Sequence, residues 1–222
     1  MAADDRSIGD ELPTEIAREI NQVAHFGRAR SVKDSVARAV QSFDDGDYAT
    51  VVELLATAKR DAPRSVTVRE LLGLAHYHLG HFRDATRELA AYRRLSGAHD
   101  QDPPFADAER ALGRPDKAVE VLSALPREEV SEEVLVEALV VLGGVLRDLG
   151  RAGEAVTVLR GGPVRPDNVV SHHLRLWYAL AEALEEAGDR REARSWWDAI
   201  YAEDPDFFDV ASRRLGVKRR VR

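Results

Sequence analysis

The 222-residue sequence contains no cysteine, which excludes a disulfide framework, a thiolate metal site and a cysteine nucleophile. Aromatic residues form only 6% of the chain, whereas alanine, leucine, valine, glutamate and arginine are abundant, and this composition favours helices. The longest apolar run, residues 138–146, has about half the length of a membrane span. The opening residues, MAADDRSIGD, are acidic and contain no apolar stretch, unlike a secretory signal. We therefore expect a cytoplasmic protein with no membrane segment.

The net charge of −7 is unevenly distributed along the chain. Residues 211–222, ASRRLGVKRRVR, contain six basic and no acidic residues, which leaves 26 basic and 39 acidic residues, a charge of −13, on residues 1–210. Such a tail has two interpretations. Its arginines lie against the acidic body, or they contact the phosphate groups of RNA. The candidates for phosphate contact are Arg213, Arg214, Lys218, Arg219, Arg220 and Arg222.

Five segments of the sequence repeat one pattern: DDGDYATVVELL, HLGHFRDATREL, ALGRPDKAVEVL, DLGRAGEAVTVL and EAGDRREARSWW. Each has a glycine, a small or β-branched residue five places later, and a large apolar residue four places after that. The glycines are Gly46, Gly80, Gly113, Gly150 and Gly188. The small column is Val51, Ala85, Ala118, Ala155 and Ala193, and the apolar column is Leu55, Leu89, Leu122, Leu159 and Trp197. Apolar residues at three-and-four spacing flank the glycines, so each unit is predicted to be a helix, a turn and a second helix.

These units of about 34 residues resemble the tetratricopeptide repeat (TPR). The segments with the clearest TPR signature are LLGLAHYHLGHFRDATREL and LWYALAEALEEAGDRREARSWWDAIYAEDP. The resemblance implies an all-α, right-handed TPR-like solenoid of about five repeats, at about 32–65, 66–99, 99–132, 136–169 and 174–207. The third repeat matches least well, because Pro103 and Pro104 must shorten or displace its first helix.

A helix is expected at each end of the repeats, where it would cover an open face of the stack. The leading helix is predicted from Pro13 to about Ala24, and the terminal helix starts near Asp206. The predicted organisation is an acidic flexible N-terminus (1–12), a single TPR domain (13–211) and a basic C-terminal tail (212–222). The segments RELLGLAHYHLG and HHLRLWYALAEALEEAGD also resemble uncharacterised single-domain TPR proteins of high-GC actinobacteria, which implies no particular activity.

Three of the seven histidines lie close together, at His76, His78 and His81. His76 and His78 are two places apart on a predicted helix, so they point about 200° away from each other. The adjacent His172 and His173 are expected to face different directions as well. We therefore expect no metal site.

The sequence contains no GxSxG, HExxH, GxxxxGK[ST] or GxGxxG motif. Gly143 and Gly144 lie inside a predicted helix, where Gly143 takes the small-residue place at which two helices approach closely. Solvated helix faces account for the many carboxylates. We therefore expect no enzyme, no catalytic residues and no cofactor.

In the TPR family, the first helices of the repeats line a concave groove, and four places on each helix point into it. Carried over to matching places, the resemblance implies a partner-binding groove formed by Lys33, Val36, Val40, Phe43, Glu70, Leu74, Tyr77, Arg110, Arg147, Arg175, Tyr178 and Glu182. Val36, Val40, Phe43, Leu74 and Tyr77 form an apolar patch in its N-terminal half, of a kind that usually binds a partner. The alternative is that the leading helix packs onto this patch and buries it.

The C-terminal half of the groove offers Arg147, Arg175 and Tyr178, which are expected to hold an acidic or extended peptide. The predicted function is a non-enzymatic protein–protein interaction scaffold that binds a peptide or helix in the groove. This prediction depends on the family resemblance, because a fold does not fix a function.

Two further hypotheses remain open. One is an RNA- or ribosome-associated factor that uses the basic tail. The other is self-association into a homo-oligomer through the region of Trp196, Trp197, Phe207 and Phe208. Trp197 is expected in the core, and its neighbour Trp196 is a candidate contact if it is exposed.

Overall fold

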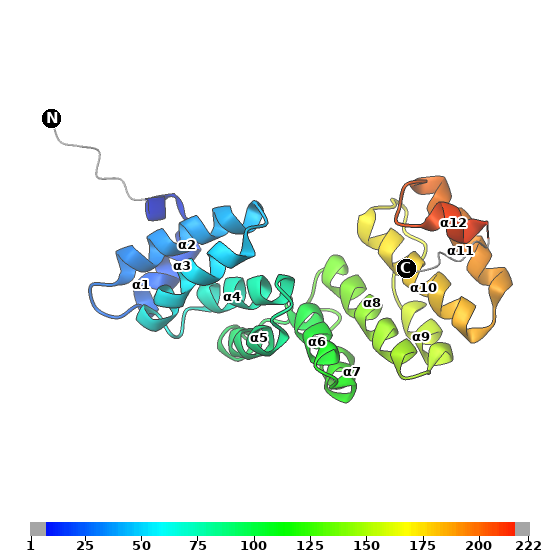
Figure 1. Cartoon of the computed structure of the whole chain (residues 1–222), viewed down its shortest axis with the longest axis horizontal. Coiled ribbons are helices and arrows are strands. Elements are labelled where there is room, and N and C mark those ends of the chain that lie inside the picture. The colour runs from blue at the N-terminus through cyan, green and yellow to red at the C-terminus, as the bar shows by residue number, and fades with distance from the viewer. Residues whose placement is uncertain (1–7, 216–222) are drawn as a thin grey trace. The chain divides into compact units, whose positions relative to one another are not determined.

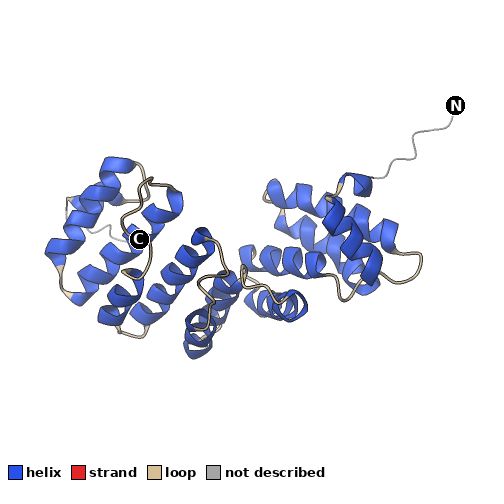
Figure 2. Cartoon of the chain, turned by 180° about the vertical axis from the view of Figure 1, so that it is seen from behind, coloured by secondary structure: helices blue, strands red, loops and turns tan. Residues whose placement is uncertain are grey.

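The computed structural model describes residues 8–215, and all the regular secondary structure in this range is helical (Figure 2). The expectation of an all-α chain is therefore confirmed. The chain divides into two compact units, residues 1–113 and 114–222, where the sequence predicts one domain over 13–211. Between residues 8 and 215, no helix combines the length and the apolar character that crossing a membrane requires.

The first unit contains two complete helix-turn-helix pairs (Figure 1). Its elements are η1 (Ile8–Glu11), α1 (Thr14–Val23), α2 (Ala29–Asp44), α3 (Tyr48–Asp61), α4 (Val66–His78), α5 (Phe82–Ser96) and α6 (Asp102–Ala111). Helix α2 packs against α3, α4 packs against α5, and α3 joins the two pairs. Helix α1 matches the predicted leading helix to within a residue at each end.

The second unit also contains two complete pairs, α8 with α9 and α10 with α11. Its elements are α7 (Pro115–Ser123), α8 (Glu132–Asp148), α9 (Ala152–Leu159), α10 (Ser171–Ala187), α11 (Arg190–Glu203) and α12 (Val210–Arg214). Helix α12 begins four residues after the predicted start of the terminal helix. The third predicted repeat is divided, since α6 belongs to the first unit and α7 to the second.

All five glycines of the repeat pattern adopt the left-handed conformation that ends the first helix of a pair. Their φ angles lie between 72° for Gly80 and Gly150 and 92° for Gly188. Residues with a Cβ atom adopt this conformation at a cost, so glycine is the residue that turns the chain here. The shortened α6 also follows from the sequence, because Pro103 and Pro104 stand in its first turn, where a helix needs no donated N–H.

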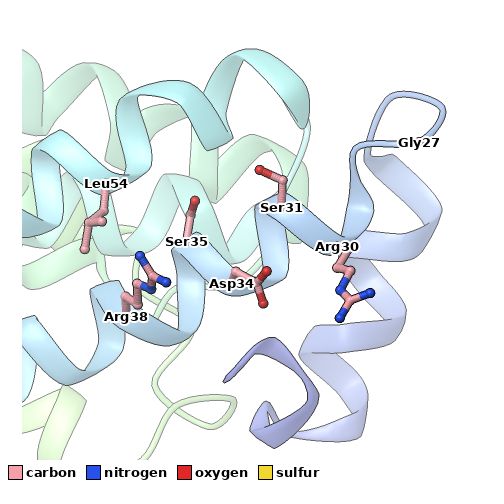
Figure 3. Close-up of a pocket in the computed structure, with 7 residues that line it drawn as sticks. All are labelled: Gly27, Arg30, Ser31, Asp34, Ser35, Arg38 and Leu54. Atoms are coloured by element: carbon pink, nitrogen blue, oxygen red, sulfur yellow. The ribbon is translucent and has the colours of Figure 1, made fainter. Parts of the chain in front are cut away.

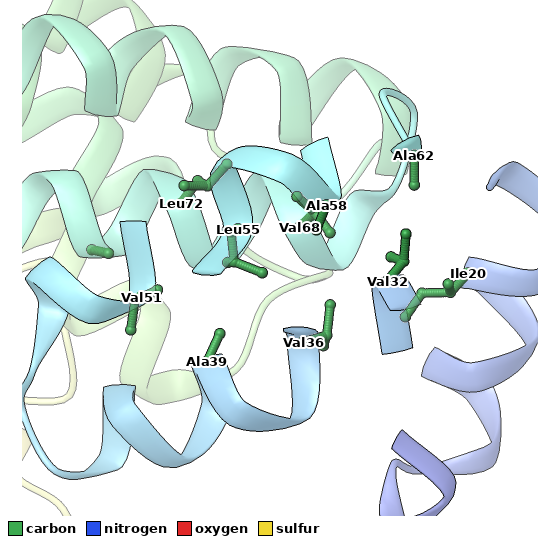
Figure 4. Close-up of a cluster of buried hydrophobic side chains, with 11 residues drawn as sticks. Ile20, Val32, Val36, Ala39, Val51, Leu55, Ala58, Ala62, Val68 and Leu72 are labelled. Carbon is green, nitrogen blue, oxygen red and sulfur yellow. The ribbon is translucent and has the colours of Figure 1, made fainter. Parts of the chain in front are cut away.

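The two columns that follow each glycine form the core of the helix pairs. The small column is at most 1% exposed and the large apolar column at most 6%. In the first unit, Val51 and Leu55 of α3 meet Val32 and Val36 of α2 in one buried cluster, which also takes in Ile20 of α1 (Figure 4). Apolar area removed from water in this way is the main favourable contribution to folding.

The leading helix is fixed by polar contacts as well as by Ile20. Glu19 of α1 accepts hydrogen bonds from the Ser65 hydroxyl at 3.0 Å and from the Val66 backbone N–H at 2.8 Å. Ser65 is fully buried and caps α4, because its hydroxyl oxygen also accepts the Val68 N–H. A carboxylate at this place is favoured by the positive end of the α4 dipole. Helix α1 is thereby held at the start of α4.

Gly73 marks the closest approach between α4 and α5, and we predict that replacing it with alanine destabilises the first unit. An alanine Cβ would lie 2.6 Å from Cδ2 and 3.2 Å from the backbone nitrogen of Leu89, which is 1% exposed. Overpacking of this kind costs about 1–3 kcal/mol, more than the roughly 1 kcal/mol that alanine gains over glycine in a helix.

Gly153→Ala is the matched control, because Gly153 stands in α9 and an added Cβ meets nothing within 4 Å. We expect a lower free energy of unfolding for Gly73→Ala and an unchanged or higher one for Gly153→Ala, measured by urea denaturation. Equal behaviour of the two variants would show that α4 and α5 are not tightly packed at Gly73.

Candidate functional site

In the first unit, the predicted groove residues form a row of half-buried side chains on α2 and α4. These are Lys33, Val40, Phe43, Glu70, Leu74 and Tyr77. Val36 is the exception and was wrongly placed in the groove, because its side chain is fully buried. The buried stripe of α2 is Val32, Val36 and Ala39, so Val36 points into the core while Lys33 and Val40 stand beside that stripe.

Aromatic rings form the apolar end of this row. Phe43 lies edge-on to Tyr48 and to His78, with ring centroids 5.1 and 5.8 Å away. The rings of Tyr48 and His78 are stacked at 4.3 Å. His78 therefore stacks on Tyr48 at the helix end although the residue is exposed, and partial burial lowers the pKa of its ring. Phe43, Val40 and Leu71 also pack against the buried cluster beneath them.

Hydrogen bonds of α4 with α6 and with Gln101, the residue before α6, form the polar end of the row. The Tyr77 hydroxyl donates to Asp107 at 2.7 Å, and Asp107 also accepts from Arg110 at 3.3 Å. Glu70 accepts from Gln101 at 2.9 Å. Burial raises the pKa of Glu70, and so does the charge of Asp100. Arg110 and Tyr77 thus share Asp107 as a hydrogen-bond acceptor, and their place in a partner-binding groove stays a prediction.

The leading segment covers only one part of the row. Gly9 of η1 rests on Lys33 and on Asp34, whose carboxylate accepts the Gly9 N–H at 3.0 Å. Helix α1 packs instead against the buried cluster and the start of α4. Ile20 of α1 lies in the buried cluster that Val40 and Phe43 pack against, and the alternative that the leading helix packs onto this patch stays a prediction.

In the second unit, both arginines predicted to hold a peptide are paired with carboxylates of the chain. Arg147 of α8 donates to Glu182 at 2.7 Å and to Glu186 at 2.6 Å, both on α10. Burial opposes the charge of Arg147, but the two glutamates raise its pKa. A second ion pair joins the same two helices with the charges exchanged, since Arg175 is on α10 and its partner Glu137 is on α8. This surface has a net negative charge, so the expectation of an acidic peptide there has no support from the geometry.

Arg213 of α12 lies in a cage at the end of the same surface. Its guanidinium donates to Glu182 at 2.7 Å, to Glu185 at 3.2 Å and to Asp209 at 3.2 Å. The Tyr178 hydroxyl donates to Asp209 at 2.6 Å, and burial followed by this bond raises the pKa of Tyr178 to about 12. Two of the predicted groove residues, Tyr178 and Glu182, therefore contact Arg213 of the chain itself.

The tail residues that the structure describes are engaged with the acidic body. Arg214 donates to Asp198 and lies over the ring of Tyr201, with 4.6 Å between Cζ and the ring centroid. Arg213 and Arg214 are therefore not placed to contact phosphate in this conformation. The other four candidates, Lys218, Arg219, Arg220 and Arg222, lie outside the described residues. The RNA hypothesis stays a prediction.

The adjacent residues Trp196 and Trp197 differ in burial, as the sequence predicts. Trp197 is 1% exposed and lies in the core of the second unit, whereas Trp196 is only half-buried and rests on Trp177 at 5.7 Å between ring centroids. Phe208 is the exposed member of the proposed contact region, at 72%. Self-association through these residues stays a prediction.

Glu132, His172 and His173 are the only three described residues that are arranged closely enough to suggest a metal site. The two histidines do not diverge as expected, because both Nε2 atoms reach the same oxygen of Glu132, at 3.2 and 3.0 Å. The Val170 N–H, however, donates to Nδ1 of His173 at 3.1 Å. The proton of the neutral ring is then on Nε2, whereas a metal-bound histidine keeps it on the other nitrogen.

The three side chains therefore form a hydrogen-bonded cluster that joins the starts of α8 and α10. Hydrogen bonds from His172 and His173 hold the pKa of Glu132 below its ordinary value. The proton that His173 carries on Nε2, between its ring and Glu132, does not fit a resident metal ion bound through that nitrogen.

An open pocket of about 470 Å³ lies on the first unit, and none of the predicted groove residues lines it (Figure 3). It is lined by Gly27, Arg30, Ser31, Asp34, Ser35, Arg38 and Leu54. Arg30 and Arg38 stand at its two ends with Asp34 between them (Figure 3).

Several solved structures resemble the chain in fold. A thermophilic TPR protein of Thermus thermophilus matches with a TM-score of 0.61, covering 83% of this chain and 97% of its own at 18% identity. YrrB, described as a TPR protein with an unusual peptide-binding site, matches at 0.58, covering 82% and 91% at 15% identity. The apo form of the quorum sensor NprR from B. thuringiensis matches at 0.70, covering 93% of this chain and 63% of its own at 13% identity.

No protein-family model and no curated protein matches the sequence. The solved structures are too distant in sequence to assign a function, but they share one fold. The chain therefore has a TPR-like helical repeat fold, and this prediction is confirmed.

Proposed function

We propose that the protein is a non-enzymatic protein–protein interaction scaffold, which binds a peptide or helix of its partner on the face formed by the first helices of the repeats. The observation that carries this proposal is the row of half-buried side chains on α2 and α4, with an apolar end at Val40 and Phe43 and a polar end at Tyr77. Apolar anchors beside hydrogen-bonding groups are the arrangement that interfaces use. YrrB, described as a TPR protein with an unusual peptide-binding site, has a similar fold, and this likeness supports the proposal.

The test compares the intact chain with a Phe43→Ala/Tyr77→Ala variant. We expect the variant to lose a partner protein that the intact chain captures from a lysate of its native host and binds again after purification. Each lost anchor should cost about 1–2 kcal/mol, and two together should weaken binding at least about tenfold.

Glu53→Ala/Arg64→Ala is the matched control, because both residues are exposed in the same unit and keep the charge balance. Phe43 is half-buried, so thermal unfolding of the variant is measured first, and Val40→Ser replaces it if the double variant is not folded. Partner binding that survives in every folded variant of the row contradicts the proposal.

A further inference from the structure

The cage around Arg213 has the chemistry of an arginine-binding site. Its guanidinium uses all three of its nitrogen atoms, one for each carboxylate of Glu182, Glu185 and Asp209. The Cζ atom also lies 5.9 Å from the ring centroid of Tyr178 and 5.5 Å from that of Trp197. A planar cation held by carboxylates at its edge and by rings at its face is the arrangement that distinguishes arginine from lysine.

The walls of the cage are held in place without Arg213. Glu185 accepts the indole N–H of Trp197 at 3.0 Å, and Asp209 accepts the Tyr178 hydroxyl at 2.6 Å. Glu182 is paired with Arg147. When the Arg213 side chain moves away, the carboxylates of Glu182, Glu185 and Asp209 remain, and Arg147 is the one cation beside them. The site is therefore preorganised and electrostatically suited to another cation.

Arg213 is also placed so that it is able to leave. It stands on α12, a helix of five residues, and its side chain keeps 25% of its surface exposed. The helix itself is anchored by Val210, which is fully buried. An exchange of this guanidinium for another cation would need a rotation of the Arg213 side chain and no movement of Val210.

We propose that this cage is the arginine-recognition site of the scaffold, occupied by Arg213 in the free protein and by an arginine of the partner's basic peptide in the complex. This inference rests on the proposed scaffold function and names the partner chemistry for the second unit. The net charge of −13 on residues 1–210 favours the approach of a basic peptide. Arg213 then competes with the partner, which lowers the apparent affinity by the fraction of molecules in which the cage is occupied.

The test uses N-acetyl-arginine amide as the probe and N-acetyl-lysine amide as its control. Binding is followed by the NMR signal of the Trp197 indole N–H, which is bonded to Glu185. That signal is assigned with Trp177→Phe and Trp196→Phe variants. We expect Arg213→Ala to bind the arginine probe at least about tenfold more tightly than the intact chain, because the competitor is gone. The lysine probe should bind neither protein, and adding Glu182→Gln and Glu185→Gln to Arg213→Ala should abolish binding.

Arg213→Lys is the second variant, since it keeps a positive charge beside the cage if Arg213→Ala does not fold. Equal binding of the arginine probe by the intact chain and by the folded variants overturns the proposal, as does equal binding of the two probes. Failure of both variants to fold, measured by thermal unfolding, also overturns it, because Arg213 is then a structural group. A partner captured through Phe43 and Tyr77 leaves the scaffold function standing in each of these cases.

Discussion

Replacing Glu88 with alanine should destabilise the first unit by about 3–5 kcal/mol, because it removes the carboxylate at the centre of a buried charge cluster. Glu88 of α5 is fully buried. It accepts hydrogen bonds from Lys59 of α3 at 2.6 Å, from Arg69 of α4 at 2.5 Å and from its neighbour Arg87 at 2.9 Å. One carboxylate thus ties three helices together, and its loss leaves three cations close to one another.

The same cluster makes the stability of the first unit depend on pH. Burial alone would raise the pKa of Glu88, but hydrogen bonds from Lys59, Arg69 and Arg87 hold it below its ordinary value. A carboxyl group with a lowered pKa stabilises the folded state above its unfolded-state pKa, and this contribution is lost as the pH falls through the folded-state value. The difference between wild type and Glu88→Ala should therefore be full at neutral pH and shrink on acidification below about pH 4.

Amide hydrogen exchange of α3, α4 and α5 measures the effect in the first unit alone, since a chain with two compact units need not unfold in one step. Glu53→Ala is the control, because Glu53 is an exposed glutamate on α3. We expect it to change the free energy of unfolding by less than about 0.5 kcal/mol. A Glu88 variant as stable as the Glu53 variant would show that the cluster contributes nothing net, as some buried ion pairs do.

The features that the sequence predicts correctly are those that recur in every repeat and depend on near neighbours. The glycine at the turn, the small residue five places later and the large apolar residue four places after that follow from helix geometry, as in Gly80, Ala85 and Leu89. The tight approach at Gly143 is another case. An added Cβ there would lie 2.9 Å from Leu159, the apolar residue of its own repeat. The helix ends and the core could be predicted for this reason.

Two features were harder to predict: which face of its helix a residue occupies, and which opposite charge each charged side chain contacts. Val36 was placed in the groove although it follows Val32 by one helical turn and shares its buried stripe. Glu88 lies between the buried residues of α5, yet the many glutamates suggested a solvated face. The ion pair of Arg147 with Glu182 could have been predicted from the sequence. The two residues are 35 positions apart, about one repeat, and so lie on neighbouring first helices. Opposite charges at matching places of successive repeats predict such pairs.

Replacing Trp197 with alanine should be the most damaging single change in the second unit, at about 3–5 kcal/mol. Trp197 is the apolar residue of the last repeat and is 1% exposed. It packs in a buried cluster with Leu174, Trp177 and Ile200, so truncation leaves a large cavity. Its indole N–H also donates to Glu185 at 3.0 Å, and that carboxylate would lose a buried donor.

Trp196 provides the control within the same helix, because its side chain is only half-buried and its indole N–H has one long bond, 3.4 Å to Glu192. Trp196→Ala should cost roughly 1–2 kcal/mol, less than half the effect of its neighbour. Hydrogen exchange of α10 and α11 measures both variants, and a larger loss at position 196 would contradict the assignment of Trp197 to the core.

Trp197→Phe separates packing from hydrogen bonding, since it keeps most of the ring volume but removes the donor to Glu185. We expect this variant to remain folded with a loosened Arg213 cage, because the ring under the guanidinium and the bond that orients Glu185 both belong to Trp197.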